Sequence, residues 1–76
     1  MDIRITKHAR ERMTSRGISE DDVIHALRHP RISYPTRRDS VCFEGADVGG
    51  RTIRVWCPTH EAGPDRYTIK STARKG

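Results

Sequence analysis

The sequence predicts an α+β fold, in which a short strand and two helices precede an antiparallel meander of three or four strands. Three observations favour this fold. Apolar residues recur at helical spacing in the first third of the chain, they alternate with polar residues after Pro35, and glycine or proline separates the segments. Helices on one face of such a sheet give a two-layer architecture. We expect residues 1–76 to form a single domain, because a chain this short holds one core.

The chain begins with a predicted strand and a capped helix. Ile3 and Ile5 flank a polar residue, which is the alternation of a strand. Thr6 is a suitable N-cap for a helix over residues 7–16, and Gly17 can take the left-handed conformation that ends a helix. The apolar face of this helix comprises Ala9, Met13 and, just before the helix, Ile5.

A second helix follows at once. Ser19 and Asp22 have the spacing of a capping box, and the acidic residues of the first turn suit the positive end of the helix dipole. Pro30 ends the helix after His29. Both helices are short, so each needs a sheet to pack against. The apolar stripe of the second helix comprises Val23, Ala26 and Leu27, with Ile24 at its margin.

The rest of the chain has the two-residue period of strands. We expect strands over residues 32–34, 41–43, 51–57 and 66–72. In the third of these, Ile53, Val55 and Cys57 point to one face, which can receive the helices. The opposite face of the last two strands then carries Arg54, Trp56, Thr68, Lys70 and Thr72.

The composition indicates a thin hydrophobic core. Leu, Ile, Val and Phe total 13 of the 76 residues, which is below the level of about a fifth at which disorder becomes a concern for charged chains. The capped helices and alternating strands nevertheless argue for a folded protein. Because so short a chain has marginal stability alone, we expect a protein partner or a homodimer.

The charge favours an anionic partner. The chain has 15 basic and 10 acidic residues, a net charge of +5, and 12 of the basic residues are arginine, whose planar fork suits phosphate oxygens. This composition is typical of proteins that bind nucleic acid or an acidic protein. The chain has two cysteines and no apolar run that resembles a signal peptide or a membrane span. We therefore expect a cytoplasmic protein without a membrane role.

One row of polar side chains lies on the first helix. His8, Arg12 and Arg16 are four residues apart, so a helix places them in one row beside the buried face. Two arginines at this spacing repel each other, so the row needs carboxylates or an anionic ligand. The structural alternative is that the arginines pair with Asp21, Asp22 or Glu44.

A family resemblance rests on the same segment. It lies in the run Ile5-Thr6-Lys7-His8-Ala9-Arg10-Glu11-Arg12-Met13, followed by Arg16-Gly17-Ile18-Ser19, an acidic helix start, Val23, Leu27 and Pro30. This segment resembles the opening of the bacterial domain of unknown function 4258 family. The similarity continues more loosely through Gly50-Arg51 and the last strands, so it covers most of the chain.

The resemblance implies a RelE-like domain, similar to the RelE- and BrnT-like toxins of bacterial toxin–antitoxin pairs. It therefore implies a metal-free endoribonuclease that needs no cofactor. The implied partners are RNA, encountered free or on the ribosome, and a small acidic antitoxin-like protein. The residues that carry over from the family are His8, Arg12 and Arg16.

Metal-free RNA cleavage needs a base, cations around the crowded phosphate and an acid for the leaving oxygen. We expect His8 to act as acid or base, and Arg12 and Arg16 to hold the phosphate. Lys70 on the last strand is expected to complete the catalytic site. The residues expected to bind RNA are Arg10, Arg54, Trp56, Thr68 and Thr72.

A non-catalytic module that binds RNA or a protein is the main alternative. Binding alone should weaken when any arginine is removed, whereas catalysis should depend on His8. The predicted loop 35–40 carries Arg37 and Arg38, which suit RNA or an acidic antitoxin, although a solvated turn is the more ordinary explanation. The chain has no glycine-rich phosphate loop and no serine-nucleophile motif, which argues against the enzyme classes that use them.

A zinc site is a less favoured alternative. Cys57 and His60 have C-x-x-H spacing, His25 and His29 lie one helical turn apart, and Cys42 adds a thiol. A cysteine on the apolar face of a strand is more often a small core residue. We therefore expect no metal.

Overall fold

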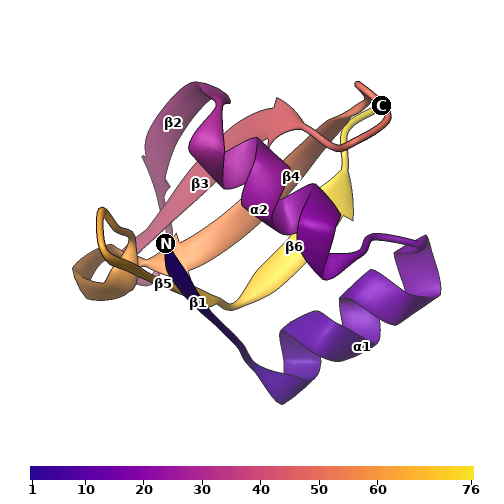
Figure 1. The fold of residues 1–76 in the computed structure, drawn as a ribbon. Coiled ribbons are helices and arrows are strands. Elements are labelled where there is room, and N and C mark those ends of the chain that lie inside the picture. Colours follow the sequence, from indigo (N-terminus) through magenta and orange to yellow (C-terminus); the bar gives the residue numbers. More distant parts are fainter.

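Two helices cover one face of a four-stranded sheet, and two short parallel strands lie beside it (Figure 1). The computed structural model describes residues 1–76. The α+β prediction is confirmed, with a strand and two helices ahead of an antiparallel sheet. In chain order the elements are β1 (Asp2–Ile5), α1 (Lys7–Arg16), α2 (Glu20–Arg28), β2 (Pro30–Thr36), β3 (Ser40–Ala46), β4 (Thr52–Pro58), a 3-10 turn (Thr59–Glu61), β5 (Arg66–Ile69) and β6 (Ser71–Arg74).

Both helices begin where their capping residues predict. The Oγ1 atom of Thr6 accepts a hydrogen bond from the N–H of Ala9 at 3.2 Å. Gly17 ends α1 at a φ of 65°, the left-handed conformation that glycine adopts without steric cost. Ser19 and Asp22 form the predicted capping box of α2. The buried residues of the two helices are the predicted ones: Ala9, Met13, Val23, Ala26 and Leu27.

The four-stranded sheet has the order β2-β3-β4-β6, and every neighbouring pair is antiparallel. Its inner face includes Ile53, Val55 and Cys57, all fully buried as predicted. Helix α2 packs against β3 and β4, and α1 packs against β6. Strands β2 and β3 are longer than predicted, because their pairing continues at both ends, to Thr36 and Ser40 at the turn and to Pro30 and Gly45 at the other end.

The prediction of one last strand over residues 66–72 is wrong. The chain breaks at Lys70, and the two halves join different sheets: β5 pairs in parallel with β1, and β6 pairs with β4. The break interrupts the alternation, so Thr72 lies opposite Val55 and faces the core. Thr68 is also buried, in the β1–β5 pair. Residues 66–72 keep their two-residue period in sequence, so no local pattern reveals this change of sheet.

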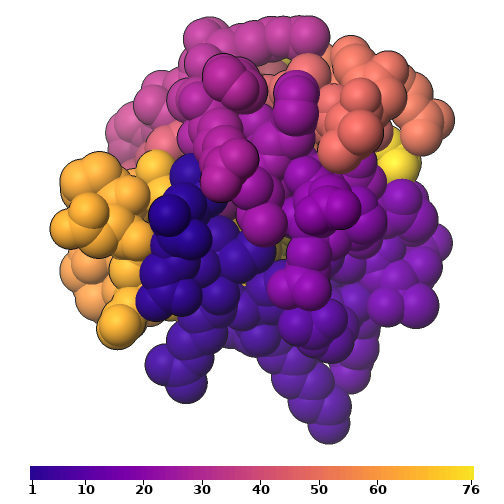
Figure 2. All heavy atoms as spheres, viewed as in Figure 1, coloured from indigo at the N-terminus to yellow at the C-terminus, as the bar shows by residue number.

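Strands β1 and β5 bring distant parts of the chain together. Asp2 pairs with Arg66 and Ile5 with Ile69, and in Figure 2 the N-terminal segment lies against the segment that precedes β5. Ten buried residues form one hydrophobic cluster, to which both helices, β4 and β5 contribute. None of the helices has the length and apolar character needed to cross a membrane.

Arg74 ties β6 to the end of α1 and to the β3–β4 turn. Its guanidinium donates to the carbonyl oxygens of Arg16 at 3.1 Å and Gly17 at 2.9 Å, and to Oδ2 of Asp47 at 3.0 Å. These bonds satisfy carbonyl groups that have no partner within the helix. Asp47 is only 2% exposed, and Oδ1 accepts from the N–H of Arg51 at 2.8 Å. Arg74 and this N–H lower the pKa of Asp47.

Candidate functional site

The outer face of the four-stranded sheet lies opposite the helices (Figure 1). Paired residues of neighbouring strands point to the same side, so the register arranges the outer face in rows. One row contains Tyr34, Cys42, Trp56 and Ser71. The next row contains Ile32, Glu44, Arg54 and Ala73. Trp56 and Arg54 therefore share the outer face, as the alternation of β4 predicts.

A pocket of about 470 Å³ opens at the end of this face nearest the β2–β3 turn. Three predicted site residues meet there from separate elements: His8 from α1, Trp56 from β4 and Lys70 from the break between β5 and β6. The wall contains basic, hydroxyl and indole groups and no carboxylate. The complete lining is His8, Thr36, Arg37, Arg38, Ser40, Trp56, Lys70 and Ser71.

Lys70 is held in the pocket by two hydrogen bonds. Its backbone N–H donates to the carbonyl oxygen of Trp56 at 2.8 Å, and Nζ donates to Oγ of Ser40 at 2.7 Å. Ser40 is buried, so its position is fixed by the sheet. An ammonium group carries more donors than this one bond uses. The remaining N–H groups of Lys70 are available to an anion.

His8 is exposed in the first turn of α1 and is bonded to its neighbour in the row. Nε of Arg12 donates to Nε2 of His8 at 3.4 Å. In this contact Nε2 lies in the acceptor position. The bond is long and exposed to solvent, so another donor can replace Arg12 at this nitrogen.

The turn between β2 and β3 presents adjacent arginines at the rim of the pocket. Arg38 and Asp39 both have positive φ angles, 62° and 50°, a conformation that costs a non-glycine residue on the order of 1 kcal/mol. The turn is held by two hydrogen bonds: the N–H of Thr59 donates to the Asp39 carbonyl at 2.7 Å, and Oγ of Ser40 donates to the Arg38 carbonyl at 3.3 Å. Oγ1 of Thr36, in the pocket lining, is buried without a hydrogen-bond partner. The pocket therefore has an unused polar group in its wall.

A buried carboxylate organises the row next to the pocket. The Glu44 side chain is 5% exposed. Its Oε2 accepts from Oη of Tyr34 at 2.7 Å and from Nε of Arg54 at 3.3 Å, and its Oε1 accepts from Nζ of Lys75 at 2.8 Å. These donors, Lys75 foremost, lower the pKa of Glu44 to about 2. Cys42 and Glu44 in turn raise the pKa of Tyr34. The ionised Glu44 carboxylate thus holds the Tyr34 hydroxyl, Arg54 and Lys75 on the outer face.

The family comparison agrees with the sequence resemblance. The sequence model described as "Domain of unknown function (DUF4258)" matches residues 5–73. The chain belongs to this family. The matched segment of the DUF4258 domain contains every residue of the pocket wall. Comparison with curated proteins and with solved structures gave no significant match.

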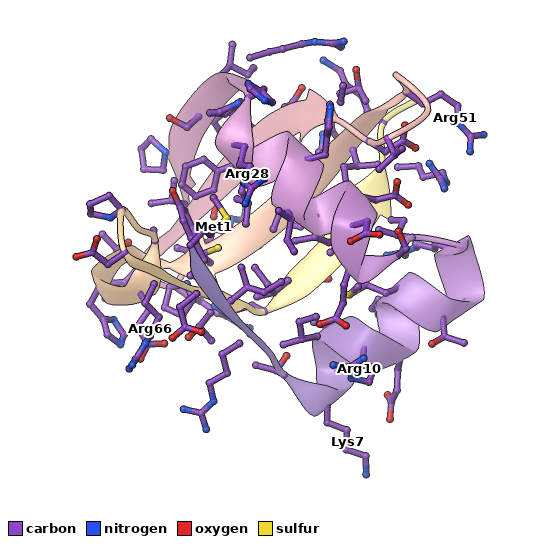
Figure 3. The ribbon with its side chains drawn as sticks, viewed as in Figure 1. Met1, Lys7, Arg10, Arg28, Arg51 and Arg66 are labelled. Carbon is purple, nitrogen blue, oxygen red and sulfur yellow. The ribbon has the colours of Figure 1, made fainter.

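The arginines of α1 in this DUF4258 domain do not act as one group. Arg16 donates through Nη1 to the carbonyl oxygen of Thr72 at 2.6 Å and does not line the pocket. Arg10, on α1 (Figure 3), lies 3.9 Å from Glu20, is exposed and does not line the pocket. Arg12 is bonded to His8. The expected alternative, in which Asp21, Asp22 or Glu44 pairs with Arg12 or Arg16, does not occur.

Two residues predicted to bind RNA are inaccessible in the DUF4258 domain. Thr68 is 7% exposed and Thr72 is fully buried. The prediction that they share the outer face with Lys70 is wrong, because the chain changes sheet at Lys70. Arg54 lies on the outer face, bonded to Glu44 rather than lining the pocket.

The residues considered as zinc ligands do not converge. Cys57 is buried in the core, and Cys42 is buried on the opposite face of the sheet. Nδ1 of His25 is hydrogen-bonded to the carbonyl oxygen of Ala46 at 2.8 Å. No group of three or more His, Cys, Asp or Glu side chains is placed to hold a metal ion.

Sequence reasoning alone misses part of the site in the DUF4258 domain. Thr36, Ser40 and Ser71 line the pocket because strand register places them around Trp56. The adjacent arginines of the 35–40 loop are the available sequence signal: they lie exposed in a turn, as a solvated turn predicts, and they also line the pocket rim. Glu44 carries no such signal, since an isolated glutamate in a strand gives no indication of its burial.

Proposed function

We propose that this domain is a metal-independent endoribonuclease of the toxin type, similar to the RelE- and BrnT-like toxins, and that its pocket holds the scissile phosphate of RNA. The composition of the pocket wall carries the proposal. An imidazole, an ammonium and two guanidinium groups lie beside one indole ring, and no carboxylate is present. The cations suit a phosphate, and Trp56 offers a surface on which a base can stack. The wall therefore suits a polyanion that carries aromatic bases.

Cleavage without a metal uses the ribose 2′-hydroxyl as the nucleophile. The 2′-oxygen forms a bond to phosphorus while the bond from phosphorus to the 5′-oxygen breaks, which yields a 2′,3′-cyclic phosphate and a 5′-hydroxyl. The 2′-hydroxyl replaces Arg12 at Nε2 of His8, and this nitrogen accepts the proton. The Lys70 ammonium donates a proton to the departing 5′-oxygen. Both groups line the same pocket.

Charge builds up on the non-bridging phosphate oxygens as the 2′-oxygen attacks. Arg37 and Arg38 at the rim, and Arg12 once released from His8, neutralise this charge. Arg16 is outside this group because its guanidinium binds the Thr72 carbonyl. Its contribution is to hold α1, and with it His8, against β6.

The test is cleavage of an end-labelled single-stranded RNA by the purified protein in excess EDTA. The wild type should produce cyclic phosphate ends, and His8→Ala should slow cleavage by about 100-fold or more, the usual contribution of general acid–base catalysis. Arg10→Ala is the matched control, because Arg10 lies on the same helix but outside the pocket. Absence of cleavage by the wild type, or equal cleavage by His8→Ala, would refute the nuclease assignment. RNA binding without cleavage would instead support the non-catalytic module.

Partners and location follow from the same proposal. The cationic pocket suits a small acidic antitoxin-like protein as an inhibitor, or a second copy of the chain as a stabilising partner. An RNA substrate, free or on the ribosome, predicts a cytoplasmic location. Co-purification with the products of neighbouring reading frames, and light scattering of the purified protein, test the two partners.

A further inference from the structure

We infer that the substrate is single-stranded RNA that extends beyond the pocket across the outer face of the sheet and stacks a second base on Tyr34. This inference rests on the proposed function, since the first nucleotide occupies the pocket. It defines a second subsite, formed by Tyr34, Arg54 and Lys75 around Glu44.

The two aromatic residues of the outer face lie in one row. Register places Cys42 directly between Tyr34 on β2 and Trp56 on β4. Neighbouring strands lie about 4.8 Å apart, so the two aromatic residues stand about 10 Å apart. Both are half-buried, whereas the smaller Cys42 is fully buried. The row therefore offers one stacking surface inside the pocket and a second one beside it.

The charges beside the second aromatic residue match a phosphate backbone. The side chains of Arg54 and Lys75 are 37% and 48% exposed, whereas that of Glu44, which holds them, is 5% exposed. Solvent thus meets the two cations and not the carboxylate. The two rows that run across this face contain no other acidic residue. A strand that leaves the pocket over Trp56 meets cations rather than carboxylates.

Glu44 fixes the second subsite before a ligand arrives. Its carboxylate accepts from the Tyr34 hydroxyl at 2.7 Å, which restricts the rotation of the ring. The same carboxylate holds Lys75 at 2.8 Å. Side chains that are ordered in advance lose less entropy on binding. Glu44 is therefore a positioning residue for the aromatic ring and the two cations.

The aromatic residues favour single-stranded RNA as the ligand over base-paired RNA or an acidic polypeptide. Base-paired RNA keeps its bases stacked within the helix, so they cannot reach Tyr34 or Trp56. An acidic polypeptide would satisfy the cations but would leave both rings without a stacking partner. Stacking of unpaired bases on aromatic side chains, next to cations that follow the backbone, is a general mode of single-strand binding.

Trp56 is the only tryptophan of the chain, so its fluorescence reports ligands that reach the pocket. The ligands are 2′-O-methyl adenylates of one and four nucleotides, whose blocked 2′-oxygen prevents cleavage. The tetranucleotide should bind at least about tenfold more tightly than the mononucleotide, the usual gain from one stacked base. Tyr34→Ala should lose the part of this gain that comes from stacking on the ring. Tyr34→Phe, which keeps the ring but not the hydroxyl, should retain most of it.

The outcomes separate the second subsite from the pocket. Equal affinity for the two ligands, or an unchanged tetranucleotide affinity in Tyr34→Ala, would overturn the second subsite but not the pocket. Absence of quenching by either ligand would overturn the proposed function as well. Competition by poly-glutamate as effective as that by the tetranucleotide would assign the face to an acidic protein. If circular dichroism shows that Tyr34→Ala is unfolded, two other measurements test the second subsite. One compares the affinities of the wild type for the mononucleotide and the tetranucleotide. The other is the effect of Lys75→Ala, which should weaken tetranucleotide binding only.

Discussion

The backbone of Gly45 on β3 lies against the backbone of Ala26 on α2, so closely that a side chain at position 45 has no room. A Cβ atom there would lie 2.5 Å from the carbonyl oxygen of Ala26 and 3.0 Å from its Cα. This contact brings α2 close enough to the sheet to bury its apolar stripe. Glycine is required at this position by space rather than by backbone conformation.

Gly45→Ala should therefore lower the free energy of unfolding by about 2 kcal/mol or more, because backbone atoms of a packed helix cannot move aside as a flexible side chain can. Urea denaturation measures the change. Gly49→Ala is the matched control, since a Cβ there meets only Oδ1 of Asp47 at 3.5 Å, an ordinary contact distance. Equal losses in the two variants would contradict the close contact between α2 and β3.

Arg74→Ala should lower the urea midpoint several times more than a typical surface substitution. The change removes the donor to the buried Asp47 carboxylate and to two carbonyl groups at the end of α1. Arg66→Ala is the comparison, because Arg66 lies 3.3 Å from Asp2 with both side chains about two-thirds exposed, and pairs of this kind contribute about 1 kcal/mol or less. A loss no greater than that of Arg66→Ala would show that the Arg74 bonds contribute little.

Acid should destabilise the protein partly through Glu44. Its pKa is about 2 in the folded protein against an ordinary value of 4.5. The depressed folded-state pKa means that this contribution to stability is complete above about pH 4.5 and is lost as the pH falls toward 2. Urea midpoints measured across this range should fall more steeply for the wild type than for Glu44→Gln. Parallel curves would contradict the network around this carboxylate, and Glu20→Gln, at an exposed site, should leave the wild-type slope unchanged.

The boundaries of the helices could be predicted from sequence, whereas the arrangement of the last strands could not. Thr6, Gly17 and Ser19 act on the backbone within a few residues of themselves, so their roles are local and visible in the sequence. The break at Lys70 depends on β1 being available to pair with β5, more than sixty residues away. Contacts at such separations have no signature in a two-residue period.

The candidate site also has residues that could be predicted from the sequence and residues that could not. His8 and Trp56 could be placed because their elements could be assigned, whereas Lys70 is indicated by its residue type alone and lies at a strand break that the sequence does not reveal. The accessibility of Thr68 and Thr72 could not, because it depends on which sheet each residue joins.

The two thiols should be unreactive in the folded protein. Burial raises the pKa of Cys57 to about 12 and also raises the pKa of Cys42, and only the thiolate attacks a disulfide reagent. A colorimetric thiol assay at about pH 8 should detect no thiol in the native protein and both thiols in concentrated guanidinium. Rapid labelling of either cysteine in the native state would contradict the packing on the corresponding face of the sheet.

RNA binding should depend on salt through the arginines of the β2–β3 turn. For single strands, the slope of log affinity against log salt changes by about 0.7 for each phosphate contact. Arg37→Ala combined with Arg38→Ala should therefore reduce the slope by about 1.4. Arg10→Ala, outside the pocket, should change it much less. An unchanged slope in the double variant would remove the turn from the proposed RNA interface.

The parallel pairing of β1 with β5 also determines when the pocket can form during synthesis. Asp2 finds its partner only when Arg66 has been made, and the pocket wall takes side chains from His8 through to Ser71. Such contacts cannot form before the later residue has left the ribosome, and contacts between residues so distant in sequence form slowly. A nascent chain thus lacks the proposed catalytic pocket until β6 has emerged and paired with β4.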